Sequence, residues 1–542
     1  MRSFRPSTLE HAEHRITDVR PLRRSINPLL PSNEFIPDGE PRVFGDRVYL
    51  YGSHDLAVGG ICAGDYVTWS APLADMSDWR FEGVIYAAVQ DPFIARRRAT
   101  GKNGIADRLF APDVLDIGGR FYLYYGVGLS ATGFGVAVAD SPTGPFEYVG
   151  RVRYPDGEKP ADWKDDTDGI DDGDSAFGAG HSALRSMISG LGEYPYDPAI
   201  LHHDGRLFLY FGLLNCSVVE LDPTDKRTVI RNPDTGDWVT PILRSSPVGV
   251  MRAWLSGRRH RTVMVNGPSI REVDGRFFLS YWAIGGQGFS GMYHAVADAP
   301  TGPFRRAGPL VALGNAWKDG QIGATDRVGN THGGMFRNEG TWYQIYHRQT
   351  ANGRQACGTA LTRRSNGAFE QADYASVGLD PRPLDAFERW PAYIACYLMG
   401  PRGLPTRGKR PILVLREHPG GTDDHDSGRL TLQVLSGTWA GAIAGFKYLD
   451  FGATPADSIE FGVEVDARES GSIDIRLDNP AGPAIATVQV SQDAVGRGWS
   501  RLAASMPGIT GVHALYLAFH PDEGEIGDVS FFGFTRDRQG AA

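Results

Sequence analysis

The chain has 542 residues, which is too long for one ordinary core and predicts two or more domains. Hydrophobic residues make up 41% and charged residues 22%, a balance that excludes a disordered chain. A net charge of −9 without a long Lys/Arg run argues against a nucleic-acid-binding protein. The sequence contains no run of about 18 apolar residues, so we expect no transmembrane helix.

Residues 1–26 read as a polar N-terminal extension without the apolar segment of a secretory signal. We therefore expect a cytoplasmic protein. The four cysteines form no CxxC pair, so we expect buried, reduced thiols rather than a zinc or redox site. They are Cys62, Cys216, Cys357 and Cys396.

One phrase recurs five times in residues 27–400. It reads GDRVYLYGS from Gly45, GGRFYLYYG from Gly118, DGRLFLYFG from Asp204, DGRFFLSYW from Asp274 and EGTWYQIYH from Glu339. Each copy is a tight turn followed by alternating large apolar residues, the pattern of a β-hairpin. Self-similarity at intervals that fit a four-stranded sheet predicts an all-β, five-bladed β-propeller.

The strand before each phrase begins near one polar residue: Asp38, Asp113, Asp197, Asn266 and His332. Similar offsets in a radial repeat should bring these side chains to one channel mouth. Clustered carboxylates are typical of glycosidic bond hydrolysis, in which one activates water and a protonated one donates to the leaving oxygen. Asp113 could instead orient an arginine, and His332 could be a core residue, a sugar contact or a metal ligand.

Aromatic side chains in the blades could stack on the apolar faces of sugars, although most should pack between blades. Phe110 has the best position, three residues before Asp113, and Trp69 is a second candidate. The others are Trp79, Trp254, Trp282 and Trp317. The acidic stretch 155–181 is expected to be a solvated loop, with a Ca²⁺ site as the alternative.

The composition of the sequence changes after residue 400. Residues 401–436 are rich in Pro, Gly and basic residues at their start and are expected to be a linker. Residues 437–542 contain short alternating strands separated by Gly, Asp, Asn and Pro, which predicts a second domain, a β-sandwich.

Two parts of the chain resemble known carbohydrate-active families. PDGEPRVFGDRVYLYGSHD, FAPDVLDIGGRFYLYYG, YDPAILHHDGRLFLYFG, NTHGG and YHRQT resemble glycoside hydrolase family 43, the five-bladed xylosidases and arabinofuranosidases. WAGAIAGFKYLDFG and GSIDIRLDNPAGPAIATVQV resemble a carbohydrate-binding module of family 6. The resemblance implies an inverting, exo-acting hydrolase of pentose-containing or furanosidic oligosaccharides, with no organic cofactor.

The same resemblance implies roles for particular residues. Asp38 matches the general base, Asp197 matches the carboxylate that tunes the acid and holds substrate, and Arg348 in YHRQT matches a substrate contact. His332 matches a channel histidine that often lies beside a Ca²⁺ or Na⁺ ion. In the C-terminal module, cleft aromatics would be Phe446, Tyr448 and Trp499, unless the module is only a structural support.

The departure from the family is at the general acid. The family has a Glu where this chain has Asn266, and an amide cannot donate a proton with a useful pKa. Glu193 is the first candidate for a substitute, ahead of Glu272, which should form a structural ion pair, and Glu40, which should orient the base. The alternatives are a leaving group that needs little acid, a non-catalytic sugar-binding protein, and a fructosyl hydrolase or transferase.

Overall fold

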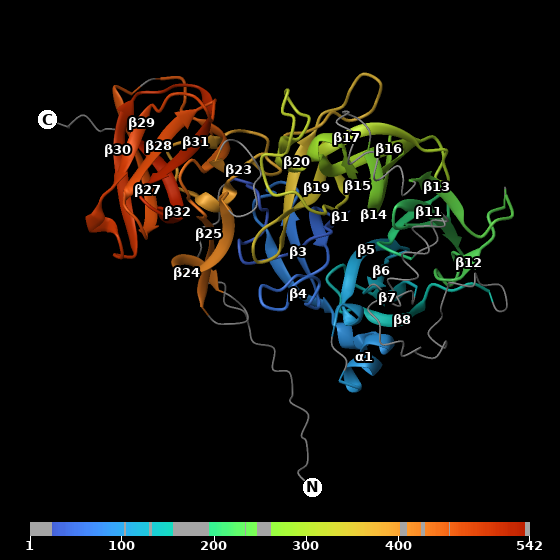
Figure 1. Ribbon diagram of the computed structural model, residues 1–542. Helices are drawn as coiled ribbons and strands as arrows, with labels where there is room; N and C mark the ends of the chain where they lie inside the picture. The colour runs from blue at the N-terminus through green and yellow to red at the C-terminus, as the bar shows by residue number, and fades with distance from the viewer. Residues whose placement is uncertain are drawn as a thin grey trace, which may run out of the picture.

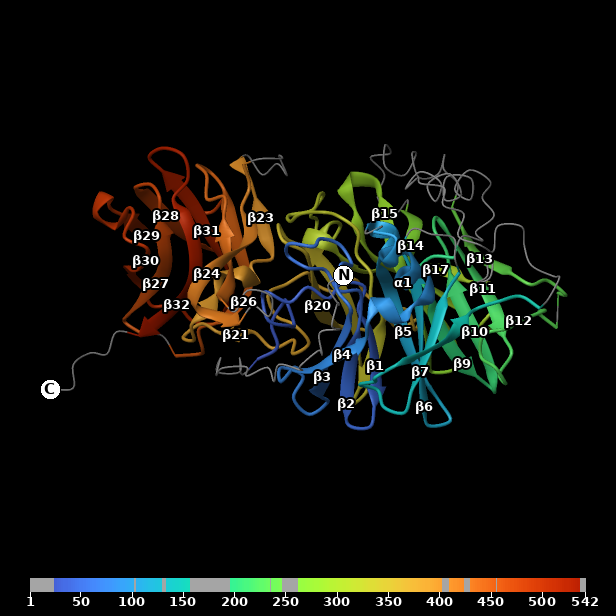
Figure 2. The same cartoon turned by 90° about the horizontal axis from the view of Figure 1, so that it is seen from below.

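The computed structural model describes residues 24–101, 104–128, 133–155, 195–233, 235–245, 262–401, 409–423, 429–454 and 456–536. A large domain of radially arranged sheets lies beside a smaller two-sheet domain, and the two views in Figures 1 and 2 agree on this arrangement. Five sheets form the large domain, so the predicted five-bladed β-propeller is confirmed.

The blades follow one another along the chain. Blade 1 contains β1 (Glu40–Phe44), β2 (Arg47–Tyr51), β3 (Tyr66–Pro72) and β4 (Arg80–Tyr86). Blade 2 contains β5 (Leu109–Ile117), β6 (Arg120–Val127), β7 (Gly135–Ala139) and β8 (Glu147–Arg151). Blade 3 contains β9 (Ala199–His203), β10 (Arg206–Phe211), β11 (Asn215–Leu221), β12 (Val229–Ile230) and β13 (Thr240–Arg244).

Blade 4 contains β14 (Thr262–Val273), β15 (Arg276–Gly285), β16 (Ser290–Ala297) and β17 (Arg305–Ala312). Blade 5 contains β18 (Met335–Asn338), β19 (Thr341–Gln349) and β20 (Arg354–Leu361). In every blade the recurrent phrase forms the turn and second strand of an antiparallel hairpin, as in β1 and β2, where Phe44 pairs with Arg47. The first strand of each hairpin is the innermost strand of its blade.

The start of the described chain completes the last blade. The backbone N–H of Leu29 donates to the carbonyl of Ala356 in β20 at 2.9 Å. The side chain of Asn27 donates to the carbonyl of Gly358 at 3.1 Å and accepts its N–H at 2.8 Å. Gly39 and Gly333 form a parallel bridge between blades 1 and 5. The ring is therefore closed by pairing between its two ends.

One α-helix and several short 3-10 helices lie between the strands. The helix α1 (Pro92–Ala99) follows β4 and begins with a proline, whose missing N–H costs nothing at that position. Asp91 caps it by accepting the N–H groups of Phe93 and Ile94, and its carboxylate also pairs with Arg151 at 2.8 Å. The 3-10 helices are Ala88–Gln90, Ile105–Asp107, Gly286–Gly288, Leu313–Asn315, Ala392–Ile394 and Gln492–Ala494.

The smaller domain is a β-sandwich, as predicted. One sheet contains β21 (Leu384–Asp385), β23 (Tyr397–Met399), β26 (Ile443–Asp450), β28 (Gly471–Leu477), β29 (Ala486–Val490) and β31 (Val512–Pro521). The other contains β22 (Trp390–Pro391), β24 (Ile412–Asp423), β25 (Leu430–Ser436), β27 (Ser458–Ala467), β30 (Trp499–Pro507) and β32 (Gly527–Arg536). Their facing apolar side chains form one core.

The boundary between the domains differs from the prediction. Residues 401–436 were expected to be a linker, but β24 and β25 lie within them and belong to a sandwich sheet. The short strands β21 to β23, expected in the propeller domain, also pair with sandwich strands. LTLQVL alternates apolar and polar residues and ILVL is a short apolar run, and both patterns are typical of strands. The Gly, Pro and charged residues around them favoured a linker instead.

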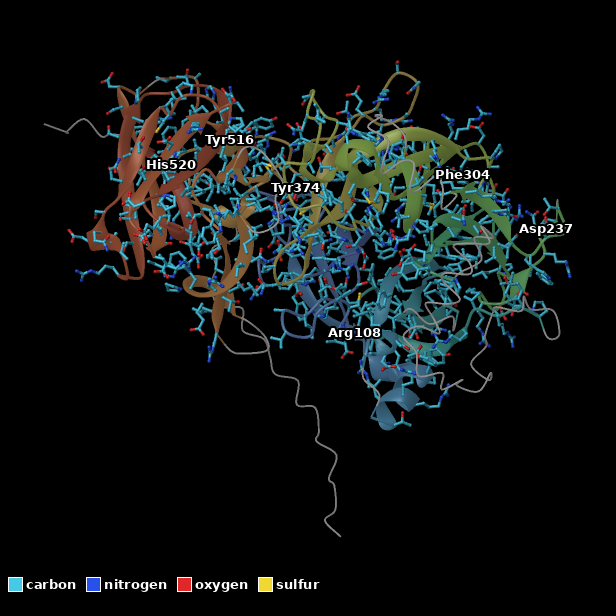
Figure 3. The ribbon with its side chains drawn as sticks, in the orientation of Figure 1. Arg108, Asp237, Phe304, Tyr374, Tyr516 and His520 are labelled. Atoms are coloured by element: carbon cyan, nitrogen blue, oxygen red, sulfur yellow. The ribbon has the colours of Figure 1, made fainter. Side chains whose placement is uncertain are left out.

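The junction between the domains is a packed surface. The backbone N–H of Ser376 donates to the carbonyl of Lys447 at 3.0 Å. The backbone N–H of Ala351, which follows β19, donates to the carbonyl of Leu413 in β24 at 3.0 Å. Figure 3 shows Tyr374 on the side of the propeller nearer the sandwich and Tyr516 on the sandwich. Backbone hydrogen bonds therefore connect the two domains directly.

All four cysteines are buried and free, as predicted. None of the helices within the described part of the chain has the length and apolar character needed to cross a bilayer.

Candidate active site

The hairpin register defines one equivalent residue at the start of each blade, nine positions before the first residue of its second strand. These ring positions are Asp38, Ala111, Asp197, Gly267 and His332. Four of the five share a left-handed backbone, with φ of 58° at Asp38, 33° at Ala111, 51° at Asp197 and 67° at Gly267. The repeated backbone therefore gives Asp38 and Asp197 equivalent places on the central channel.

Two residues predicted at this level occupy other positions. Asp113 lies two residues beyond the ring position of its blade. Because a strand rises about 3.3 Å per residue, Asp113 is about 7 Å deeper in the channel. It is fully buried, pairs with Arg42 at 2.6 Å and accepts the N–H of Ile200 at 2.9 Å. Asn266 lies one residue before Gly267 and is half-buried. Asp113 therefore joins blades 1, 2 and 3 below the channel mouth.

Asp38 is held as a carboxylate. Ser53, opposite it in the hairpin, donates to its Oδ2 at 2.7 Å, and the guanidinium of Arg354 lies 3.4 Å from both of its oxygens. Burial raises the pKa of Asp38, but the charge of Arg354, the imidazoles of His347 and His332 and the Ser53 bond together lower it to about 2. A carboxylate that stays ionised in this way suits a general base.

Arg354 is fixed by a second carboxylate. Its Nε and Nη2 donate to the two oxygens of Asp55 at 2.9 and 2.8 Å, a bidentate pair that leaves Nη1 for Asp38. The backbone N–H of Arg354 also donates to Asp55 at 3.1 Å. The guanidinium therefore has a fixed orientation toward the base.

His347 is a neutral imidazole that accepts hydrogen bonds beneath the site. Its Nδ1 accepts the backbone N–H of Asp38 at 3.1 Å and that of His332 at 3.3 Å. An acceptor Nδ1 assigns the proton of the neutral ring to Nε2. Burial lowers the pKa of His347 to about 3 despite the charge of Asp38. The imidazole therefore fixes the backbone at two ring positions.

Asp197 has the opposite electrostatic environment. Burial and the negative charge of Asp38 raise the pKa of its carboxyl to about 7, although His332, Arg354 and the backbone N–H of Gly267 act in the other direction. Two carboxyl groups of equivalent position thus differ in protonation near neutral pH. Such a difference is the arrangement that separates an acid from a base.

Glu40 lies one layer below Asp38. Its Oε2 accepts from Arg271 at 2.8 Å and from Ser269 at 3.1 Å, while its Oε1 lies 3.8 Å from Nε2 of His332. Burial and the charge of Asp113 raise the pKa of Glu40 to about 7, against the lowering effect of Arg271. Glu40 therefore anchors the floor of the site through blade 4.

His332 stands between the two layers. Its Nδ1 lies 3.7 Å from Asp38 and its ring packs on Gly267, where a Cβ atom would come within 2.7 Å of it. Among the residues described, no group of three or more His, Cys, Asp or Glu side chains is arranged to hold a metal ion. The channel ion beside His332 stays a prediction, and no step of the chemistry below uses one.

Replacing Gly267 with alanine should displace His332. The substitution places a Cβ on a left-handed backbone, which should lower the free energy of unfolding by about 1–2 kcal/mol. The same Cβ would press against the imidazole ring of His332. Gly275→Ala is the matched control, because its φ is 75° and nothing lies within 4 Å of the added atom. Urea unfolding should show similar losses for both variants, whereas kcat should fall only for G267A. Equal kcat values would show that contact with Gly267 does not position His332.

The remaining predicted contacts divide into two groups. The ring of Phe110 lies 6.4 Å from that of Tyr196, the neighbour of Asp197, so it borders the site. Trp69 donates its indole N–H to Glu34 at 3.1 Å and is packed in the core of blade 1. Arg348 donates to the carbonyls of Tyr393 at 2.7 Å and Ala395 at 3.1 Å. Trp69 and Arg348 therefore support packing.

The other candidates are placed as follows. Glu272 lies at the far end of β14, and its Oε2 is 3.0 Å from Nδ1 of His203. It therefore pairs with His203 and not with its neighbour Arg271. Glu193, Trp254 and the stretch 156–194 lie outside the described residues.

The aromatic residues proposed for the sandwich cleft differ in burial. Phe446 is fully buried, with its ring centroid 4.3 Å from that of Phe532 in the core. A core position excludes Phe446 from a ligand cleft. Trp499 packs edge to face on His418 at 4.7 Å and is half-buried, and Tyr448 is half-buried as well.

Ser53, His347 and Arg354 contact Asp38 or its backbone but were not predicted. The first two could have been found from the hairpin register, because Ser53 lies opposite Asp38 and His347 lies opposite His332. Arg354 is the first residue of β20, where no sequence pattern marks it.

Comparison with known proteins finds relatives of both domains. Residues 423–536 match the model of the carbohydrate binding module of family 6. The chain is 30% identical over 526 residues to a xylosidase/arabinosidase from Thermoclostridium stercorarium, covering 95% of this chain and 99% of that one. It is 24% identical over 550 residues to an arabinoxylan arabinofuranohydrolase from Paenibacillus polymyxa, covering 92% and 73%.

The chain is also similar to a solved structure. The glycoside hydrolase family 43 arabinoxylan arabinofuranohydrolase from Bacillus subtilis, in complex with cellotetraose, is 22% identical with a TM-score of 0.44, covering 95% of this chain and 98% of that one. With the near full-length relative at 30% identity, the chain is a glycoside hydrolase that belongs to family 43.

Proposed function

We propose that the protein removes terminal arabinofuranosyl or xylosyl residues from arabinoxylan-type oligosaccharides with inversion at the anomeric carbon. The observation that carries the proposal is the ionised Asp38, held by Ser53 and Arg354 at the start of the innermost strand of blade 1. The names of the relatives, xylosidase/arabinosidase and arabinoxylan arabinofuranohydrolase, support the choice of pentose.

In this mechanism Asp38 accepts a proton from a water molecule as its oxygen attacks the anomeric carbon. The leaving oxygen departs from the opposite face and is protonated by an acid of the protein. Arg354 keeps Asp38 ionised before the attack, and the backbone bonds to His347 keep Asp38 in place. These residues supply orientation and charge without a covalent intermediate.

The sandwich is proposed to bind carbohydrate, in keeping with the family model that it matches. The described aromatics that remain available for this role are Tyr448 and Trp499, since Phe446 is in the core.

A substrate screen tests the proposed function. The purified protein is incubated with aryl α-arabinofuranosides, aryl β-xylosides and arabinoxylan oligosaccharides, and the first anomer released is read by NMR. We expect free pentose of inverted configuration. Release of the retained anomer would contradict the mechanism, and release of fructose alone would support the alternative enzyme class.

A non-catalytic sugar-binding role is the second candidate, because Asn266 cannot supply a proton. Oligosaccharide binding in calorimetry with no pentose released from any glycoside would establish that role instead.

A further inference from the structure

We propose that Asp197 is the proton donor of the reaction. This inference rests on the proposed function and assigns the step that Asn266 leaves without an acid. It follows from the position of Asp197, from the groups around it and from the state of the other carboxylates at the channel.

Asp197 and Asp38 occupy equivalent places in their blades. Each lies two residues before its innermost strand, with φ of 51° and 58°, and each is at most 6% exposed. The backbone N–H of Gly267 donates to the carboxyl of Asp197. Asp197 therefore lies against the start of blade 4, beside the position where the resemblance to the family predicts an acid.

The partners of the two carboxyl groups differ in kind. Asp38 receives a hydroxyl and a guanidinium, which stabilise its anion. Within the described residues, Asp197 forms no ion pair with Lys or Arg, and a single backbone N–H faces its carboxyl. A buried carboxyl that pairs with no Lys or Arg favours its neutral form, and the nearby anion of Asp38 adds to this preference, against the lowering effect of His332 and Arg354 on the pKa.

The protonation states follow from these surroundings. Burial raises the pKa of Asp197 to about 7, whereas the pKa of Asp38 lies at about 2. Near pH 6 one carboxyl is thus an acid and the other a base. Catalysis should decline as pH rises through about 7, because the donor is lost, and should decline only at very low pH, because the base is then protonated.

The other described carboxylates near the channel pair with basic side chains away from the ring level. Glu40 is bound to Arg271 at 2.8 Å in the layer below, and Asp113 is bound to Arg42 at 2.6 Å. Glu272 lies at the opposite end of β14 beside His203. None of these three groups starts from the ring level of Asp38 and Asp197.

The step balances as follows. The water oxygen forms a bond to the anomeric carbon and gives one proton to Asp38. The bond from that carbon to the leaving oxygen breaks, and its electron pair stays on this oxygen, which takes the proton of Asp197. The products are the free sugar and an alcohol, and Asp197 is left as a carboxylate. Proton exchange with solvent restores both groups.

Leaving-group dependence is the test. Asp197→Asn should lower kcat by about 10²- to 10⁴-fold on a 4-methylphenyl glycoside, whose phenolate needs protonation, and far less on the 2,4-dinitrophenyl glycoside. The decline of activity above pH 7 should disappear with the activated substrate. Asp197→Glu should keep part of the activity on both substrates. Asp140→Asn, at an exposed carboxylate, is the matched control and should leave both rates unchanged.

Equal losses on the two substrates would overturn the assignment, as would a leaving-group-dependent loss in Glu193→Gln but not in Asp197→Asn. Difference infrared spectroscopy provides a readout independent of turnover. Because the pKa of Glu40 is raised to about 7 as well, the spectra of Asp197→Asn are subtracted from those of the wild type, and the remaining protonated carboxyl band should titrate near pH 7. Its absence would also overturn the assignment. If the wild-type protein cleaves no glycoside, the proposed function fails, and the infrared titration still shows whether Asp197 holds the proton.

Discussion

Asp38→Asn is expected to lower kcat by about 10²- to 10⁴-fold on every glycoside that the protein hydrolyses. The amide is nearly the same size and can still accept the Ser53 hydroxyl, but it cannot take a proton from water. Because the base acts on water, the loss should be the same for good and poor leaving groups. Steady-state kinetics with the two aryl glycosides measures this.

Asp298→Asn is a suitable control for Asp38→Asn, since Asp298 is an exposed carboxylate that pairs with Arg276 at 2.9 Å. Its kcat should equal that of the wild type. Rescue of the Asp38→Gly variant by azide, giving a glycosyl azide of inverted configuration, would support the role of a general base. Undiminished hydrolysis by Asp38→Asn would contradict the assignment of the base and, with it, the proposed mechanism.

Arg42→Met should reduce the free energy of unfolding by about 3–5 kcal/mol. The change removes the only guanidinium that pairs with Asp113 among the described residues, and it leaves that carboxylate fully buried without a counter-charge. Arg42 also donates to the carbonyl of Ile200 at 2.9 Å, so contact between blades 1 and 3 is lost as well. Urea unfolding followed by tryptophan fluorescence provides the measurement.

The double variant Arg42→Met, Asp113→Asn should recover part of this loss, because the asparagine removes the buried charge and still accepts the N–H of Ile200. Arg120→Met breaks an exposed pair with Asp140 and should cost less than about 1 kcal/mol. A loss in Arg42→Met no larger than that of Arg120→Met would show that the Arg42–Asp113 pair does not stabilise the ring.

Much of the propeller could be predicted because its signal is repeated. Five copies of one hairpin phrase gave the number of blades and the innermost strand of each. The depth of individual residues was harder, since a shift of two residues moves a side chain one layer along the channel. Asp113 was placed with Asp38 for this reason, although its register position matches that of Glu40.

The surroundings of the carboxylates could not be predicted, because they arise from contacts between distant parts of the chain. Arg354 reaches Asp38 across a separation of 316 residues, and Arg271 reaches Glu40 across 231. No local pattern encodes such contacts, yet the contact of Arg354 with Asp38 contributes to the difference in pKa between Asp38 and Asp197. The sandwich boundary was missed for a different reason, because β24 and β25 pair with each other but lie in a segment rich in Gly, Pro and charged residues.

Ring closure also has a consequence for biosynthesis. Asn27 pairs with Gly358 across 331 residues, so the leading segment emerges from the ribosome long before its partner strand exists. Long-range pairing of this kind makes folding slow and leaves strand edges exposed in the meantime. The guanidinium of Arg354 arrives with the same final blade. A nascent chain released before that blade is made should therefore have neither a closed ring nor catalytic power.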